Sequence, residues 1–170
     1  MIIKANSRQE IHPDRIGEKP QVLAGRVAVA DLPRLLEAVA RPEGELGYKV
    51  TALLDRQRRK VVSCIIEGFV FLTCQSSLED FRHGISVDDR LVLVEREAEL
   101  PPVEEEDEAE DYMVAEGPLD VLDLVEDAVL LALPMVPRKP GLEEGGARKP
   151  PREPGASPFA ALAGLRKRPK

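Results

Sequence analysis

Aromatic residues are scarce in this chain of 170 residues: they make up 4% of it, and tryptophan is absent. Apolar residues still amount to 43%, so we expect a core built from valine, leucine, isoleucine and alanine. A chain of this length accommodates one domain of ordinary size with additional tail segments.

Cysteines and long apolar runs are also few. Cys64 and Cys74 are the two cysteines, too few for a disulfide framework and typical of a reducing compartment. No apolar run approaches the roughly 18 residues that a membrane span needs. The N-terminal residues are polar and charged, without the apolar segment of a secretory signal peptide. We therefore expect a cytoplasmic protein with no membrane partner.

Residue patterns that carry catalysis or hold cofactors are missing. His12 and His83 have no carboxylate or thiol at the spacing of a catalytic triad, and neither cysteine has a second ligand at zinc spacing. No glycine-rich phosphate loop is present. The neighbouring Asp88 and Asp89 fit a turn better than an acid–base pair. The sequence therefore predicts a protein that is not an enzyme and that takes no metal, cofactor or small-molecule substrate.

Charge is sorted along the last third of the chain. Residues 95–127 contain fifteen carboxylates and one cation, whereas residues 138–170 contain nine Lys and Arg against three acids. The net charge of the whole chain is −7. Such a separation indicates an electrostatic partner: nucleic acid, another protein or the chain itself.

Hydrophobic periodicity predicts a single α+β domain over residues 21–136. The expected strands, each with alternating or β-branched residues, span 21–30, 46–54, 60–73, 81–87, 90–97 and, briefly, 112–115. Gly68 is expected to mark a bulge or bend. The middle of the chain should form an antiparallel sheet, or a partly open barrel, of about five strands with two main helices.

The two helices are expected from apolar residues at helical spacing. The first spans residues 32–39 and follows Asp31, which stands at the N-cap position. The second spans residues 119–133 and ends at Pro134. Its carboxylates are expected together on the side opposite its apolar residues: Asp120, Asp123, Glu126 and Asp127.

Four segments outside these elements are expected to be loosely ordered or tethered. Residues 1–20 mix charges without periodicity and predict a flexible arm. Residues 99–111 predict an acidic loop, because like charges repel and cannot bury surface. Residues 137–156 are rich in proline and glycine and predict a disordered linker. Residues 157–170 predict a short basic C-terminal helix on a flexible arm.

Two clusters supply the candidate binding residues. The first lies in a predicted hairpin turn and consists of Arg56, Arg58, Arg59 and Lys60. The second lies near the C-terminus and consists of Phe159, Leu162, Leu165, Arg166, Lys167, Arg168 and Lys170. The cations of either cluster could contact phosphates. Solvated turns and termini are also often basic without any partner, and four cations alone give only modest, salt-sensitive affinity.

Four stretches of the chain resemble the YceD family, the large ribosomal RNA subunit accumulation proteins of bacteria and plastids. They are Gly25-Arg26-Val27 with Asp31-Leu32-Pro33-Arg34-Leu35; Leu72-Thr73-Cys74-Gln75-Ser76-Ser77-Leu78-Glu79; residues 119–137, with Val125-Glu126-Asp127 and Leu133-Pro134-Met135-Val136-Pro137; and Ser157-Pro158-Phe159 to Lys167. They follow the order of the family and span residues 25–167.

The chain departs from the family pattern in two places. Where the family often has C-x-x-C-L, Ser77 replaces the second thiol after Cys74. The family also often has a histidine soon after its P-x-V-P segment and a cysteine beyond it, whereas Arg138 and Lys139 follow here and no later cysteine exists. A metal or redox role is therefore not carried over to this chain.

The resemblance implies a non-catalytic role in the synthesis, processing or stability of 23S ribosomal RNA. The implied partner is the 23S precursor or a large-subunit ribosomal protein, which we expect the C-terminal arm to help engage. The alternative is an acidic adaptor that holds a basic ribosomal protein and does not contact RNA. The net charge of −7 favours this alternative somewhat, because repulsion from RNA must be overcome locally.

Overall fold

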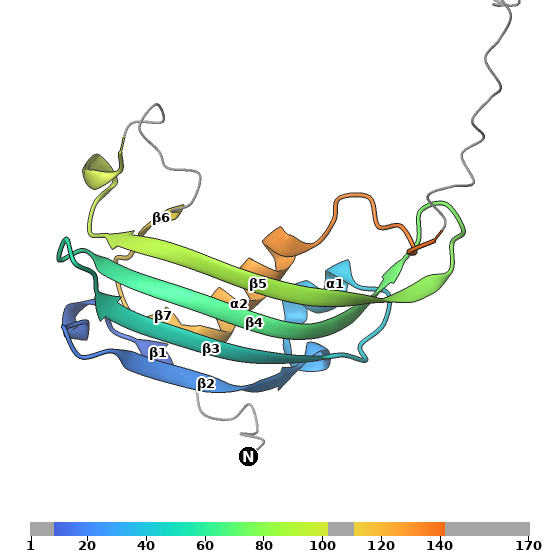
Figure 1. Cartoon of the computed structure of the whole chain (residues 1–170), viewed down its shortest axis with the longest axis horizontal. Helices are drawn as coiled ribbons and strands as arrows, with labels where there is room; N and C mark the ends of the chain where they lie inside the picture. Colours follow the sequence, from blue (N-terminus) through green and yellow to red (C-terminus); the bar gives the residue numbers. More distant parts are fainter. Residues whose placement is uncertain (1–8, 102–110, 142–170) are drawn as a thin grey trace, which may run out of the picture. The chain divides into compact units, whose positions relative to one another are not determined.

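A computed structural model of the chain describes residues 9–101 and 111–141. They contain a five-stranded sheet in the order β2-β3-β4-β5-β6 (Figure 1). The strands are β2 (Gln21–Ala28), β3 (Glu45–Leu54), β4 (Lys60–Thr73), β5 (Asp80–Val94) and β6 (Asp111–Val114). The first four pair antiparallel, whereas β6 pairs parallel with the end of β5. The expected α+β class is confirmed; the sheet is mixed and stays open.

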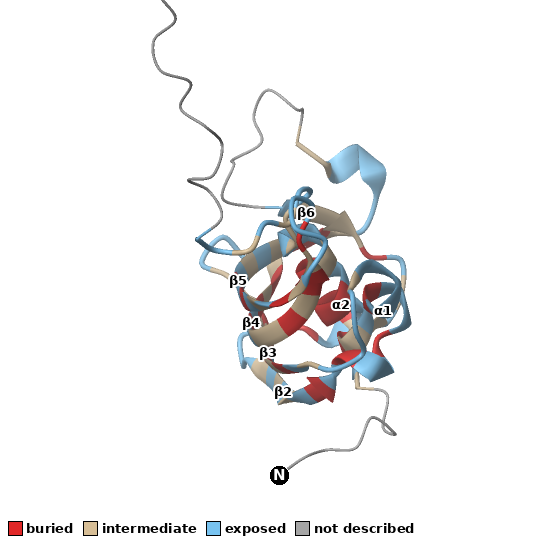
Figure 2. Ribbon diagram, turned by 90° about the vertical axis from the view of Figure 1, so that its right-hand side faces the viewer, coloured by how far each residue is buried: buried red, intermediate tan, exposed pale blue. Residues whose placement is uncertain are grey.

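Two helices lie on one face of the sheet, α1 (Pro33–Ala38) and α2 (Val121–Ala132). Figure 2 shows the sheet curving around α2. The buried residues of α2 recur at helical spacing, which gives the helix one apolar side: Val121, Leu124, Val125, Ala128 and Val129. Asp120 caps the helix by accepting hydrogen bonds from the backbone N–H groups of Leu122 and Asp123.

The core lies between α2 and the face of the sheet that it covers, which we call the inner face. On β4 every second residue is buried there, as Val62, Ile66 and Val70 show. Cys64 belongs to the same row and is 1% exposed. The core is mainly aliphatic, as the low aromatic content predicted, with Tyr48 and Phe81 as its buried aromatic residues.

The N-terminal residues 9–20 differ from the expected flexible arm. A two-residue strand, β1 (Glu10–Ile11), pairs antiparallel with β7 (Leu119–Asp120), and Ile11 is fully buried. A 3₁₀ turn, η1 (Pro13–Arg15), follows. The apolar side chains that anchor this segment are isolated among charged residues, so they leave no periodicity in the sequence.

β5 is one continuous strand, whereas the sequence predicted two strands joined at Asp88 and Asp89. Both residues keep their places in the ladder, opposite Ile65 and Cys64 of β4. The long apolar run of β4 dictates this pairing and carries the two carboxylates through the strand. The expected turn at these residues is therefore wrong.

Gly68 and Asp31 also behave differently from their predictions. Gly68 pairs with Leu46 and Ile85 without interruption, so the strand has no bulge there. A Cβ at Gly68 would lie 2.1 Å from the backbone oxygen of Glu45, so close approach of β3 requires glycine. Asp31 ends a 3₁₀ turn, η2 (Val29–Asp31), and the N-cap of α1 is Leu32, which has no side chain to cap with. A third 3₁₀ turn, η3 (Glu97–Glu99), follows β5.

Candidate functional site

A buried carboxylate joins the two helices. Glu126 of α2 is 1% exposed, and its Oε1 accepts a hydrogen bond from the backbone N–H of Leu35 at 2.8 Å. Its Oε2 accepts from Nε of Arg34 at 2.9 Å. Arg34 also donates to Asp127, and the hydrogen bonds to Glu126 and then Asp127 raise the pKa of its guanidinium. Helical spacing placed Glu126 on the polar side of α2, and that prediction is wrong about its exposure.

The junction unites sequence stretches that carry the family resemblance. Arg34 and Leu35 belong to the first stretch, and Glu126 belongs to the third. The second stretch joins them, because the backbone N–H of Gln75 donates to the carbonyl of Pro137 at 3.0 Å. In Figure 1 the orange segment after α2 runs to the green turn between β4 and β5. The fourth stretch lies outside the described residues.

Large apolar side chains are exposed beside this junction. They are Leu78 (77% exposed), Leu131 (84%), Met135 (100%) and Val136 (56%). We call these four residues the C-terminal apolar surface. Single exposed apolar residues are ordinary on proteins, but apolar residues that gather on one surface mark interaction sites. Leu131 is on α2, Met135 and Val136 lie in the segment after it, and Leu78 lies in the turn that the bond between Gln75 and Pro137 ties to that segment.

A groove lies between α2 and the end of the sheet at β5 and β6. Its volume is about 480 Å³, and most of its lining is apolar: Cys64, Leu91, Met113, Leu124, Ala128 and Leu131. Three carboxylates also line it: Asp89, Asp111 and Asp127. Burial raises the pKa of Asp89, and the charges of Asp111 and Asp88 raise it further. Burial and the charge of Asp89 raise the pKa of the Cys64 thiol to about 11, so Cys64 is an unreactive thiol at neutral pH.

The structure brings the hairpin cations together in the β3–β4 turn, as predicted, but most of them already bind carboxylates. Arg58 pairs with Glu18 at 3.3 Å, Arg59 with Asp55 at 2.8 Å and Lys60 with Glu95 at 2.8 Å. Arg56 is exposed and makes no ion pair within the described ranges. Binding of RNA or a partner by this cluster stays a prediction.

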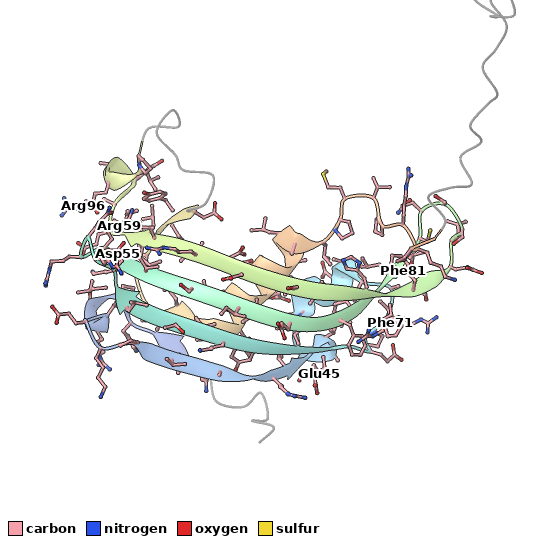
Figure 3. All side chains as sticks on the ribbon, in the orientation of Figure 1. Glu45, Asp55, Arg59, Phe71, Phe81 and Arg96 are labelled. Atoms are coloured by element: carbon pink, nitrogen blue, oxygen red, sulfur yellow. The ribbon has the colours of Figure 1, made fainter. Side chains whose placement is uncertain are left out.

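Asp55 explains why Arg59 is held in the turn. Burial acts to raise the pKa of this carboxyl, but hydrogen bonds from the backbone and side chain of Arg59 and from the backbone N–H of Gln57 outweigh it and lower the pKa. Figure 3 shows Asp55 and Arg59 together at one end of the sheet. Arg59 therefore closes the hairpin.

The C-terminal candidates lie outside the described residues: Phe159, Leu162, Leu165, Arg166, Lys167, Arg168 and Lys170. Across residues 9–101 and 111–141, no group of three or more His, Cys, Asp or Glu is arranged to hold a metal ion. The helices in this part of the chain are all too short or too polar to cross a membrane.

Comparison with known proteins places the chain beside one family. Residues 62–166 match the family described as "Large ribosomal RNA subunit accumulation protein YceD". A relative of that name from Haemophilus influenzae is 25% identical over 175 residues, which cover 93% of this chain and 95% of the relative. No solved structure matches the chain.

Proposed function

Because the chain belongs to the YceD family of large ribosomal RNA subunit accumulation proteins, we propose that it acts, without catalysis, in the accumulation of large-subunit ribosomal RNA. The finer proposal is that it supports synthesis, processing or stability of the 23S precursor in the cytoplasm. Its direct partner is then the precursor RNA or a large-subunit ribosomal protein.

The junction at Glu126 is the observation that carries the proposal. The match at residues 62–166 contains α2 and the segment that follows it. Within that region Glu126 is buried and binds Arg34 and Leu35 at the start of α1, while Met135, in the segment after α2, is fully exposed. Large apolar residues left exposed after a helix that is anchored in this way support a binding surface, because folding alone gives no reason to expose them.

The C-terminal segment has a part in this proposal. Residues 157–170 combine Phe159, Leu162 and Leu165 with a run of cations. We propose that the apolar residues dock and that Arg166, Lys167 and Arg168 contact RNA phosphates or an acidic surface of the partner. Removal of residues 157–170 should then reduce function without unfolding the domain.

A specific observation favours a second candidate function, the acidic adaptor. The groove beside α2 has an apolar lining with Asp89, Asp111 and Asp127, a chemistry that suits a protein segment with apolar and Lys or Arg side chains. In this alternative the chain holds a basic ribosomal protein and never contacts RNA.

The test of the proposed function is genetic. Cells that lack the gene should contain less large-subunit than small-subunit ribosomal RNA, and the full chain should restore the ratio. Normal ratios in the deletion strain would contradict the proposal. A gel shift of the purified chain with 23S fragments at two salt concentrations separates the candidates, since a steep salt dependence indicates phosphate contacts and absence of binding supports the adaptor.

A further inference from the structure

Two of the four phenylalanines of the chain lie on the face of the sheet opposite the helices. Phe69 and Phe71 of β4 are half-buried, and they alternate with Val70 and Leu72, which are buried in the core. Their ring centroids are 5.9 Å apart, and the rings are nearly perpendicular at 87°. Figure 3 shows Phe71 at the end of the sheet away from Asp55 and the basic hairpin.

An arginine side chain lies over each of the two rings. The guanidinium carbon of Arg82, on β5, lies 4.1 Å from the centroid of Phe69. That of Arg41, in the segment after α1, lies 5.4 Å from the centroid of Phe71. We call Phe69, Phe71, Arg41 and Arg82 the aromatic–arginine platform.

The two arginines differ in their other partners. Arg41 donates a hydrogen bond to Asp80 at 2.7 Å. Arg82 is exposed and forms no ion pair with any described residue, so the ring of Phe69 is the partner that the structure gives it. Its charge therefore remains available to an anion, because the residue is exposed.

The backbone beside the platform carries no side chain at Gly84. Gly84 stands opposite Phe69 in the ladder, and a Cβ added at Gly84 would meet no atom within 4 Å. The side chain that β5 places over the Phe69 ring is therefore that of Arg82. Lys49 is exposed on the same face of the sheet, and so is the carboxylate of Glu45, which stands opposite Phe69.

Support of the sheet by itself does not explain this arrangement. Cross-strand aromatic pairs do stabilise sheets, but Phe69 and Phe71 lie on the same strand and stand opposite a glycine and an arginine of β5. In a chain with only 4% aromatic residues, two adjacent rings lie on the solvent side of the sheet, and the arginine over one of them pairs with no carboxylate of the described residues. Stacked arginine and aromatic planes are the groups on which unpaired nucleic-acid bases stack.

We propose that the aromatic–arginine platform binds single-stranded RNA. One base stacks on the free plane of the Arg82 guanidinium and a neighbouring base packs against the ring of Phe71, while the charge of Arg82 faces the phosphate between them. The proposal rests on the proposed function, which makes large-subunit RNA the nucleic acid at hand, and it names the surface that contacts it.

The experiment measures binding of the full chain to a fluorescently labelled single-stranded RNA of about twelve nucleotides by anisotropy. Phe71→Leu keeps an apolar side chain and removes the ring, and Arg82→Gln removes the plane's charge. Each should weaken binding roughly 5- to 100-fold, the range expected for one lost base stack. Arg82→Gln should also lower the slope of log K against log salt by about 1, whereas Phe71→Leu should leave that slope unchanged.

Arg15→Gln is the matched control. Arg15, in η1, is likewise exposed and without an ion pair in the described part of the chain. Its variant should bind RNA as the unmodified chain does, whereas Arg56→Gln tests the hairpin cluster. Thermal unfolding of all four variants checks that the fold is intact, and a duplex RNA of the same sequence should bind more weakly than the single strand.

Each outcome decides the proposal. Loss of binding in Arg56→Gln but not in Arg82→Gln would assign RNA to the hairpin cations and overturn it. Absence of RNA binding by the unmodified chain would overturn the proposal in favour of the adaptor. Platform variants that bind RNA normally but no longer bind a basic ribosomal protein would do the same. The proposed function fails separately, through normal ribosomal RNA in the deletion strain, so the two failures are distinguishable.

Discussion

Arg34 and Glu126 are 92 positions apart in the sequence, and their side chains meet in an ion pair of 2.9 Å between Nε and Oε2. The two ends of this pair differ in environment, because the side chain of Arg34 is 50% exposed and that of Glu126 only 2%. The second oxygen of Glu126 accepts the backbone N–H of Leu35. One carboxylate thus fixes the start of α1 against the middle of α2.

Removal of this carboxylate should destabilise the domain. Glu126→Ala leaves the buried N–H of Leu35 without an acceptor, and we expect a loss of about 2–4 kcal/mol in the free energy of unfolding. Glu126→Gln keeps an acceptor and should lose about half as much. Asp127→Asn is the control, since it removes only the exposed partner of Arg34 and should cost less than about 1 kcal/mol. Urea denaturation measures all three, and equal losses for Glu126→Ala and Asp127→Asn would refute this account.

Gly68 should not tolerate a side chain. In Gly68→Ala the new Cβ would lie 2.1 Å from the backbone oxygen of Glu45, so β3 and β4 must separate, and we expect a loss of about 2–3 kcal/mol. Gly84→Ala is the matched control on β5, where nothing lies within 4 Å of the added Cβ. It should change stability by less than about 1 kcal/mol. Thermal unfolding that ranks the two variants in the opposite order would contradict the close approach of β3.

Asp89 should make the domain less stable as the pH rises. Burial and then the charges of Asp111 and Asp88 raise its pKa in the folded state. The folded state therefore holds this proton more tightly than the unfolded chain, and stability falls as the pH rises from the unfolded pKa of about 4 through the folded pKa. Asp89→Asn should be more stable than the unmodified chain at pH 7, and the difference should vanish below about pH 4.

Chemical denaturation at a series of pH values measures this difference. Asp123→Asn, at an exposed carboxylate of α2, is the control and should change stability within about 0.5 kcal/mol at each pH. A variant Asp89→Asn that is less stable than the unmodified chain at pH 7 would show that the carboxylate has a favourable partner in the groove.

The C-terminal apolar surface should matter for function and not for folding. Leu131 and Met135 are 84% and 100% exposed, so the double variant Leu131→Gln, Met135→Gln should change the free energy of unfolding by about 0.5 kcal/mol or less. In the deletion strain it should fail to restore large-subunit RNA. Val22→Thr, at an apolar residue that is 51% exposed on β2, should restore it fully. Full rescue by the double variant would remove this surface from the proposed function.

The resemblance to the YceD family was visible in the sequence and is confirmed by the match over residues 62–166. Strands with a continuous apolar or alternating pattern, such as β4, were also predictable, because side-chain alternation follows from the strand itself. That β5 is one continuous strand was not predictable. Asp88 and Asp89 prefer turns, but their pairing with β4 in the sheet keeps them in the strand. The anchoring of residues 9–20 through Ile11 was hidden for a similar reason, since one apolar residue shows no period.

The candidate sites divide in the same way. The sequence identified the hairpin cations, but only the structure showed that Arg59 and Lys60 are occupied by carboxylates. The sequence also gave no sign that Phe69 and Phe71 face solvent beside Arg82. Whether a residue of β4 points into the core or away from it depends on where α2 packs.

By itself, the sequence determined the α+β class, the family, a mainly aliphatic core and the separation of charge, since these follow from composition, local periodicity and residue order. Only the tertiary structure decided which polar groups are buried and which apolar groups are exposed. Glu126 and Met135 show why, because burial depends on what packs against a side chain. Glu126 is buried against a segment distant in the chain, whereas no distant segment covers Met135 among the described residues.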